Sequence, residues 1–260
     1  MPTSEQKNSS LIEKLFKAGA HFGFTKSRRH PTITPYIFAN KLGTDIFDLE
    51  KTAQLLEDAK TMLKEAGEKG QTVMYVGTKD EVAKIVTSVA AKADIPLVAN
   101  RWIGGLLTNF SEIRKRLERL KSLNAERESG ELERKYIKKE RVIIGREVDK
   151  LQFNFGGIQK IDRTPHMLLV VDPRHDFIAV QEAKEIGIPV VAIMSSDCDV
   201  SKITQPVIVN DALTSSVTLA LSELTDAYLE GRKNYTPAPV RTVRTESRPM
   251  VRQTTSTTRR

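Results

Sequence analysis

The sequence predicts an α/β fold: a parallel β-sheet covered by helices on both faces, an inserted helical hairpin and a basic tail. Three observations predict it. Short apolar runs alternate with amphipathic stretches, one long charged segment has no strand pattern, and the last residues lose all apolar periodicity. Near-continuous apolar runs are typical of strands buried on both faces of a parallel sheet. A chain of 260 residues is long enough to bury a large core.

The first 70 residues are expected to form a helix, two short strands and a second helix. Residues 9–20 have the apolar spacing of a short amphipathic helix. Prolines exclude a helix in the next stretch, where short strands are expected at residues 36–38 and 44–49. Residues 49–70 repeat apolar side chains at helical spacing and predict a longer helix.

Strand and helix patterns then alternate along the chain. The expected strands are residues 73–77, 95–98, 167–172, 188–193 and 207–209. The expected helices are residues 80–93, 177–186 and 213–229. Apolar strands separated by amphipathic helices predict a three-layer arrangement with the sheet in the middle.

Residues 108–155 interrupt this alternation and predict an antiparallel α-helical hairpin, a short coiled coil, between two strands. A single apolar seam runs along the otherwise charged first arm, at Phe110, Ile113, Leu117, Leu120 and Leu123. Ser129 and Gly130 form the turn. The return arm is irregular, because Gly145 lies in its middle and residues 142–144 are all apolar. Each arm would be roughly 25–30 Å long.

The composition changes after Gly231, where prolines, threonines and arginines dominate and no periodicity remains. Such a segment is expected to be a disordered basic tail. The predicted domains are an α/β domain of residues 1–107 and 156–231, the hairpin of residues 108–155, and the tail of residues 232–260.

The net charge of +8 is unevenly distributed along the chain. Residues 232–260 contain eight basic residues and one acid, so the rest of the chain is nearly neutral overall. Its cations are clustered instead. The acid-free residues 24–42, called the basic stretch below, contain Lys26, Arg28, Arg29 and Lys41. Local clusters of this kind favour a polyanion as partner, and we expect these four side chains to contact phosphates.

Further nucleic-acid contacts are expected around the hairpin and after the first buried strand. The expected residues are Lys79, Arg101, Asn109, Arg114, Lys115 and Arg116. Arg101 precedes Trp102, which either packs where the hairpin leaves the sheet or belongs to an RNA-tracking loop. The run at residues 114–116 is either a phosphate contact or a solvated helix face paired with neighbouring glutamates.

The sequence gives little support for a catalytic or a metal site. The chain has neither a G-x-x-x-x-G-K-[ST] nor a G-x-G-x-x-G sequence. Asp172 follows a strand, where it could serve chemistry or cap the next helix. The histidines and the lone Cys198 have no ligand spacing. We expect no catalytic residues, no metal and no cofactor. The alternative is a nucleotide- or small-ligand-binding enzyme on the same fold.

The expected location is the cytoplasm. No run of about 18 apolar residues is present, so no membrane span is expected. The first ten residues lack the order of a signal peptide, and one cysteine allows no internal disulfide.

Nine short motifs occur in an order that resembles one known family. They are AGAHFG (residues 18–23), RRHPTITPYIF (28–38), IFDLEKT (46–52), YVGTK (75–79), RWIGGLLTNF (101–110), FGGI (155–158), VVDPR (170–174), EAKEIGIPVVAI (182–193) and ND (210–211). Each is weak alone, but nine in order are specific. The sequence is similar to the bacterial type of the ribosomal protein S2 family, over about residues 11–228.

The resemblance implies a flavodoxin-like layered domain with a protruding hairpin. It also implies a structural role in the small ribosomal subunit during translation, not catalysis. The implied partners are small-subunit rRNA and neighbouring small-subunit proteins, with ribosomal protein S1 among the candidates. The implied location is the cytoplasm, in the ribosome.

Overall fold

The computed structural model describes residues 4–235 and contains a central sheet of five parallel strands. The strands are β4 (Val73–Val76), β5 (Leu97–Val98), β6 (Met167–Val171), β7 (Val190–Met194) and β8 (Gln205–Ile208). Their order is β5-β4-β6-β7-β8. Numbered from β4 onward this order is 2-1-3-4-5, the flavodoxin-like arrangement. The predicted α/β fold with a parallel sheet is confirmed.

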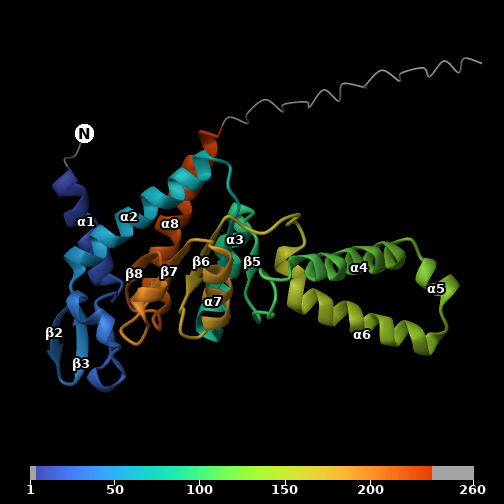
Figure 1. The fold of residues 1–260 in the computed structure, drawn as a ribbon, viewed down its shortest axis with the longest axis horizontal. Helices are drawn as coiled ribbons and strands as arrows, with labels where there is room; N and C mark the ends of the chain where they lie inside the picture. The colour runs from blue at the N-terminus through green and yellow to red at the C-terminus, as the bar shows by residue number, and fades with distance from the viewer. Residues whose placement is uncertain (1–3, 236–260) are drawn as a thin grey trace, which may run out of the picture.

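Four helices cover one face of the sheet (Figure 1). They are α1 (Ser4–Lys17), α2 (Leu49–Glu68), α3 (Asp80–Ala93) and α8 (Thr214–Lys233). Side chains that alternate along the strands, such as Val73 and Tyr75 of β4, are buried against these helices. Arg232 and Lys233, assigned to the tail from composition, end α8. Asn234 and Tyr235 follow the helix, and residues 236–260 of the predicted tail lie outside the described residues.

The opposite face is covered by α7 (Phe177–Ile186) and by the loop after β5. The ends nearest the sheet of the two long helices inserted after that loop cover the rest of this face. Met74 and Val76 of β4 point to this side and join its core. Both faces are therefore buried, which explains why the strand sequences are almost continuously apolar.

Two glycines allow α2 and α8 to pack closely. A Cβ atom on Gly67 would collide with the backbone of α8, and one on Gly231 would collide with the carbonyl oxygen of Lys64. Figure 1 shows the two helices side by side. Two helices that are far apart in the sequence thus pack together in the same helical layer.

A second, antiparallel sheet lies beside the main one, in the order β1-β3-β2. It consists of β1 (Phe22–Thr25), β2 (Ile37–Lys41) and β3 (Thr44–Phe47). The patterns at residues 36–38 and 44–49 predicted β2 and β3 with shifted ends. β1 was not predicted, because four residues that include a glycine carry little strand signal.

Three helices lie between β5 and β6: α4 (Phe110–Glu128), α5 (Glu131–Lys135) and α6 (Lys138–Phe155). α4 and α6 extend together to one side of the sheet (Figure 1). Five residues form a small core between them, namely Leu120, Leu123, Leu132, Ile144 and Val148. Ile113, Leu117 and Phe155, nearer the sheet, belong instead to the core under α7. Within residues 4–235, no helix has the length and apolar character needed to cross a membrane.

Candidate nucleic-acid interface

The basic stretch is held against the loop that follows β7. The backbone N–H of His30 donates to the carbonyl oxygen of Ser196 at 2.8 Å. The backbone N–H of Phe24 donates to the hydroxyl oxygen of the same serine, also at 2.8 Å. The sequence gives no sign of this contact, because the two segments are about 170 residues apart. The cations of the stretch are consequently positioned at the edge of the main sheet.

The basic stretch is free of acids in the sequence but not in space. Arg28 stacks over the ring of Phe24 at 4.4 Å and lies 3.5 Å from the carboxylate of Asp197. Arg29 lies 3.6 Å from the carboxylate of Asp45, which is fully buried. Counting charges along the chain misses both partners. Arg29 therefore neutralises a buried acid, whereas Arg28 stays largely exposed.

Lys26 and Lys41 lie at the same end of the small sheet, on either side of its central strand β3. The backbone N–H of Lys26 donates to the carbonyl oxygen of Gly43, and Lys41 ends β2 opposite Thr44. Both lysines are exposed, and neither forms an ion pair with any residue in the described range 4–235. They are thus the two members of the basic stretch whose charge is uncompensated there.

The turn between β2 and β3 carries a strained, exposed leucine. Leu42 and Gly43 both have positive φ, 52° and 82°, as a two-residue hairpin turn requires. Asparagine or glycine is usual at the first position, and a branched apolar residue is strained there. The Leu42 side chain is 97% exposed, so packing against the described residues does not explain the strained turn. Sequence reasoning did not identify this residue.

Two further cations lie beside the basic stretch, on loops that follow β6 and β7. Arg174 donates to Asp197 at 2.6 Å, and Lys202 lies 3.4 Å from Asp199. A pocket of about 500 Å³ opens between them, with the exposed ring of Phe177 in its wall. These residues were not predicted, because each cation is isolated in the sequence.

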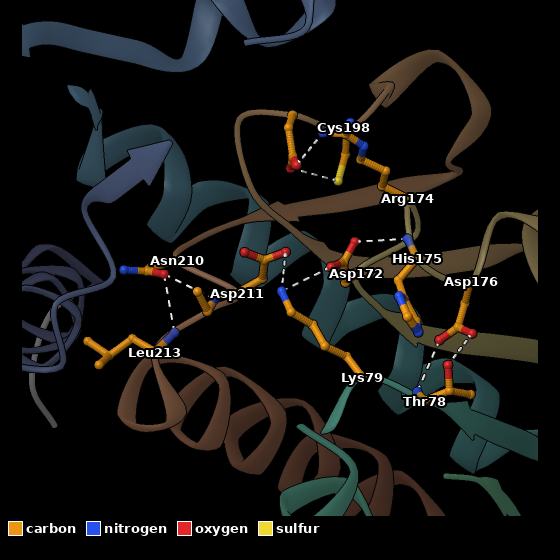
Figure 2. A network of polar contacts seen from close by, with 12 residues as sticks. Thr78, Lys79, Asp172, Arg174, His175, Asp176, Cys198, Asn210, Asp211 and Leu213 are labelled. Carbon is orange, nitrogen blue, oxygen red and sulfur yellow. Dashed lines mark hydrogen bonds and ion pairs between the residues drawn. The ribbon is translucent and has the colours of Figure 1, made fainter. Parts of the chain in front are cut away.

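Lys79 is turned toward carboxylates at the carboxyl ends of the strands (Figure 2). Its amine lies 3.1 Å from Asp172 and 3.9 Å from Asp211, and its side chain is mostly buried. Burial alone would lower the pKa of Lys79, but Asp211 and Asp172 raise it on balance. The charge of this lysine is therefore compensated inside the protein.

The acids around Lys79 occupy the position where flavodoxin-like folds commonly bind ligands, between β4 and β6. Asp172 has a left-handed backbone, with φ of 61°, and its carboxylate accepts the backbone N–H of His175 at 3.1 Å. Asp176 accepts both the hydroxyl and the backbone N–H of Thr78, at 2.7 and 3.1 Å (Figure 2). These contacts tie the loop after β6 to the loop after β4. The helix α7 itself begins at Phe177 without a side-chain cap from Asp176.

Asp211 is the least satisfied acid of this group. Its side chain is completely buried, and neither carboxylate oxygen has a hydrogen-bond partner among the described residues. Burial, followed by repulsion from Asp172, raises its pKa to about 7. No group of three or more histidine, cysteine, aspartate or glutamate residues in the described part of the chain could hold a metal ion.

Arg101 and Asn109 flank a loop whose centre is locked to α7. The carboxylate of Glu182 accepts hydrogen bonds from the indole of Trp102 and from the backbone of Gly105 and Leu107, at 2.8–3.1 Å. Trp102 is buried, which favours the packing interpretation of this residue. Arg101 is exposed beside it, and Asn109 is exposed just before α4.

The predicted cations on α4 differ in their surroundings. Arg114 pairs with Glu118 at 3.2 Å and Lys115 with Glu112 at 2.6 Å, in both cases on the exposed surface. Arg116 is exposed and has no ion pair among residues 4–235. Exposed pairs are weak and exchange readily for phosphate contacts, so all three remain available to a polyanion.

The sequence matches one family along most of its length. A family profile described as "Ribosomal protein S2" matches residues 15–231. "Small ribosomal subunit protein uS2" of Picosynechococcus sp. is 40% identical over 85% of this chain and 86% of that protein. The protein of the same name from Coprothermobacter proteolyticus is 39% identical over 85% of this chain and 82% of that protein. "Small ribosomal subunit protein uS2c" of Emiliania huxleyi is 38% identical over 86% of this chain and 97% of that protein.

Proposed function

The chain belongs to the ribosomal protein S2 family, and from this premise we propose how it contacts rRNA. The protein is a structural constituent of the small ribosomal subunit that acts in translation, and it is not an enzyme. Its place is the ribosome in the cytoplasm. The alternative of an enzyme on the same fold is set aside. Partners of this class are rRNA and other proteins of the small subunit.

The proposed rRNA contact is the tip of the small sheet, with Lys26 and Lys41 as its charged residues. The observation that carries the proposal is that these two exposed lysines lie at the same end of the small sheet and have no ion pair within residues 4–235. Uncompensated surface cations release counterions from a phosphate backbone without first losing a protein partner. Leu42 follows Lys41 in the turn at this end of the sheet, and its side chain is 97% exposed.

Arg101 and Arg116 extend the proposed surface toward the hairpin, because both are exposed without ion pairs among the described residues. Asn109, Arg114 and Lys115 are kept as weaker contributors to it. Arg28 is proposed as a contact shared between Asp197 and phosphate. Arg29 and Lys79 are left out, since their charges face buried carboxylates.

The test is the salt dependence of binding to small-subunit rRNA. Replacing Lys26 and Lys41 together by alanine should lower the slope of log K against log salt by roughly 0.7–0.9 for each lost phosphate contact. Incorporation into small subunits should weaken at the same time. Lys84 and Lys92, two exposed lysines of α3, provide a matched control in which the slope is retained. An unchanged slope in the Lys26/Lys41 variant would remove the tip from the interface.

Attachment of ribosomal protein S1 is a finer proposal, supported by the family resemblance alone. It predicts that small subunits assembled without this protein carry less S1 than complete subunits do. Equal amounts of S1 in the two preparations, measured by quantitative mass spectrometry, would contradict it.

A further inference from the structure

Gly145 lies in the middle of α6, where packing among the described residues does not require a glycine. Glycine is among the least favourable residues in a helix interior. A Cβ atom at this position would meet nothing within 4 Å, so no close approach by another part of the described chain requires glycine. Gly67 and Gly231 differ in this respect, because added Cβ atoms there would collide with a neighbouring helix.

The outward face of α6 carries three large exposed apolar side chains. Val142, Ile143 and Phe153 are 50%, 57% and 59% exposed. Val142 and Phe153 lie along the centre of the face that points away from α4, with Ile143 at one flank and Gly145 at the other, as helical spacing dictates. Large exposed apolar groups that gather on one face indicate a contact surface.

Basic side chains alternate with these apolar residues along the face. Lys139, Arg146 and Lys150 share the outward face, and none of them forms an ion pair within residues 4–235. Asp149 is an acid on the same face. The surface thus combines separated apolar side chains, an excess of positive charge that is unpaired among residues 4–235, and a position without a side chain.

We propose that this outward face of α6 binds a neighbouring protein of the small subunit, through a segment that presents apolar side chains flanked by carboxylates. The inference rests on the proposed function only in that the partner is sought within the small subunit. The charge excess is complementary to acids. The three large apolar side chains favour a protein over RNA, because a contact with phosphates does not bury apolar surface. Gly145 lets the backbone of the partner segment approach that of α6.

The first test separates the stability of the free protein from its assembly. Gly145→Ala should raise the thermal midpoint of the free protein by a few degrees, because alanine favours the helix. Gly145→Leu should also leave the free protein folded, yet lower its affinity for small subunits stripped of this protein by about tenfold, since the added side chain blocks a close contact. Ala125→Leu, at an exposed position of α4, adds the same bulk elsewhere and should bind normally. Normal binding of Gly145→Leu would overturn the proposal.

The second test identifies the occupant. Benzoylphenylalanine in place of Val142, in full-length protein assembled into small subunits, should crosslink to one small-subunit protein. That product should resist ribonuclease, be lost on protease digestion, and disappear in the Gly145→Leu background. A crosslink to rRNA alone, or no crosslink, would overturn the proposal. Neither result would bear on the proposed rRNA contact at the end of the small sheet, because the Lys26/Lys41 variant tests that contact separately.

Discussion

The indole N–H of Trp102 donates to the carboxylate of Glu182 across 3.1 Å, although 80 positions separate the two residues. The same carboxylate accepts the backbone N–H groups of Gly105 and Leu107. Burial alone would raise the pKa of Glu182, but these hydrogen bonds lower it on balance. One buried acid of α7 thus holds the loop from which the hairpin starts.

Replacing Glu182 by glutamine should destabilise the protein by about 2 kcal/mol or more. The glutamine keeps one acceptor oxygen and points an amide N–H₂ at groups that also donate. Urea unfolding at neutral pH measures the loss, with Glu185→Gln on the exposed side of α7 as control. The wild-type contribution is present above the ordinary pKa of glutamate and is lost as the pH falls through the lowered value. An unfolding midpoint equal to that of the control would show that the carboxylate is not needed.

Replacing Asp211 by asparagine should stabilise the protein at pH 8 relative to the wild type. The pKa of Asp211 rises from an ordinary value of 3.8 to about 7. Its contribution to stability is therefore greatest below pH 3.8, falls as the pH rises toward 7 and is flat above it. Asparagine mimics the protonated acid at every pH, so its advantage should be clear at pH 8 and smaller at pH 5. A loss of stability that is equal at both pH values would contradict this account.

Arg28 and Arg29 should behave differently when each is replaced by alanine. Arg29→Ala leaves the buried carboxylate of Asp45 without its ion-pair partner and should cost about 1–3 kcal/mol of stability. Adding Asp45→Asn should recover part of that loss. Arg28→Ala removes an exposed side chain and should affect rRNA binding more than unfolding. Equal unfolding free energies for the two single variants would refute the distinction.

Removing the outer part of the hairpin should leave the α/β domain folded. We propose residues 108–155 as a projecting unit, but Ile113, Leu117 and Phe155 pack into the core under α7. Arg119 and Glu147 meet across the two arms at 3.4 Å, so a short glycine linker can replace residues 119–149. This deletion should retain cooperative unfolding, whereas deletion of residues 108–155 should lower stability further. Loss of cooperativity in the shorter deletion would show that the whole hairpin belongs to the main core.

The sequence predicted β4, β6 and β7 closely, because each is buried on both faces and is therefore an apolar run. β5 is shorter than the expected residues 95–98, and β8 begins at Gln205 instead of at residue 207 because its first two residues, Gln205 and Pro206, break the apolar pattern. The helices at residues 80–93 and 177–186 were predicted to the residue. The charged surface was harder to predict. Arg29 faces an acid of β3, and Arg28 faces an acid in a loop far along the chain, so local charge counting cannot find either partner.

Two features of the interface left almost no signal. Glu182 looks like any glutamate of an amphipathic helix until its five donor groups are placed around it. The exposed turn at Leu42 depends on a backbone conformation that a leucine does not suggest. Both depend on tertiary contacts or backbone geometry instead of on periodicity.

The close packing of α2 against α8 determines when this protein can fold during its own synthesis. α2 ends at Glu68, but α8 is not finished until Lys233 has been added. Until then α1 can pack against α2, but the surface of α2 that α8 covers stays exposed. A nascent chain therefore carries exposed apolar surface through most of its translation, a state that favours aggregation and binding by chaperones. Chains that terminate before α8 should accumulate as degradation substrates instead of as partly folded proteins.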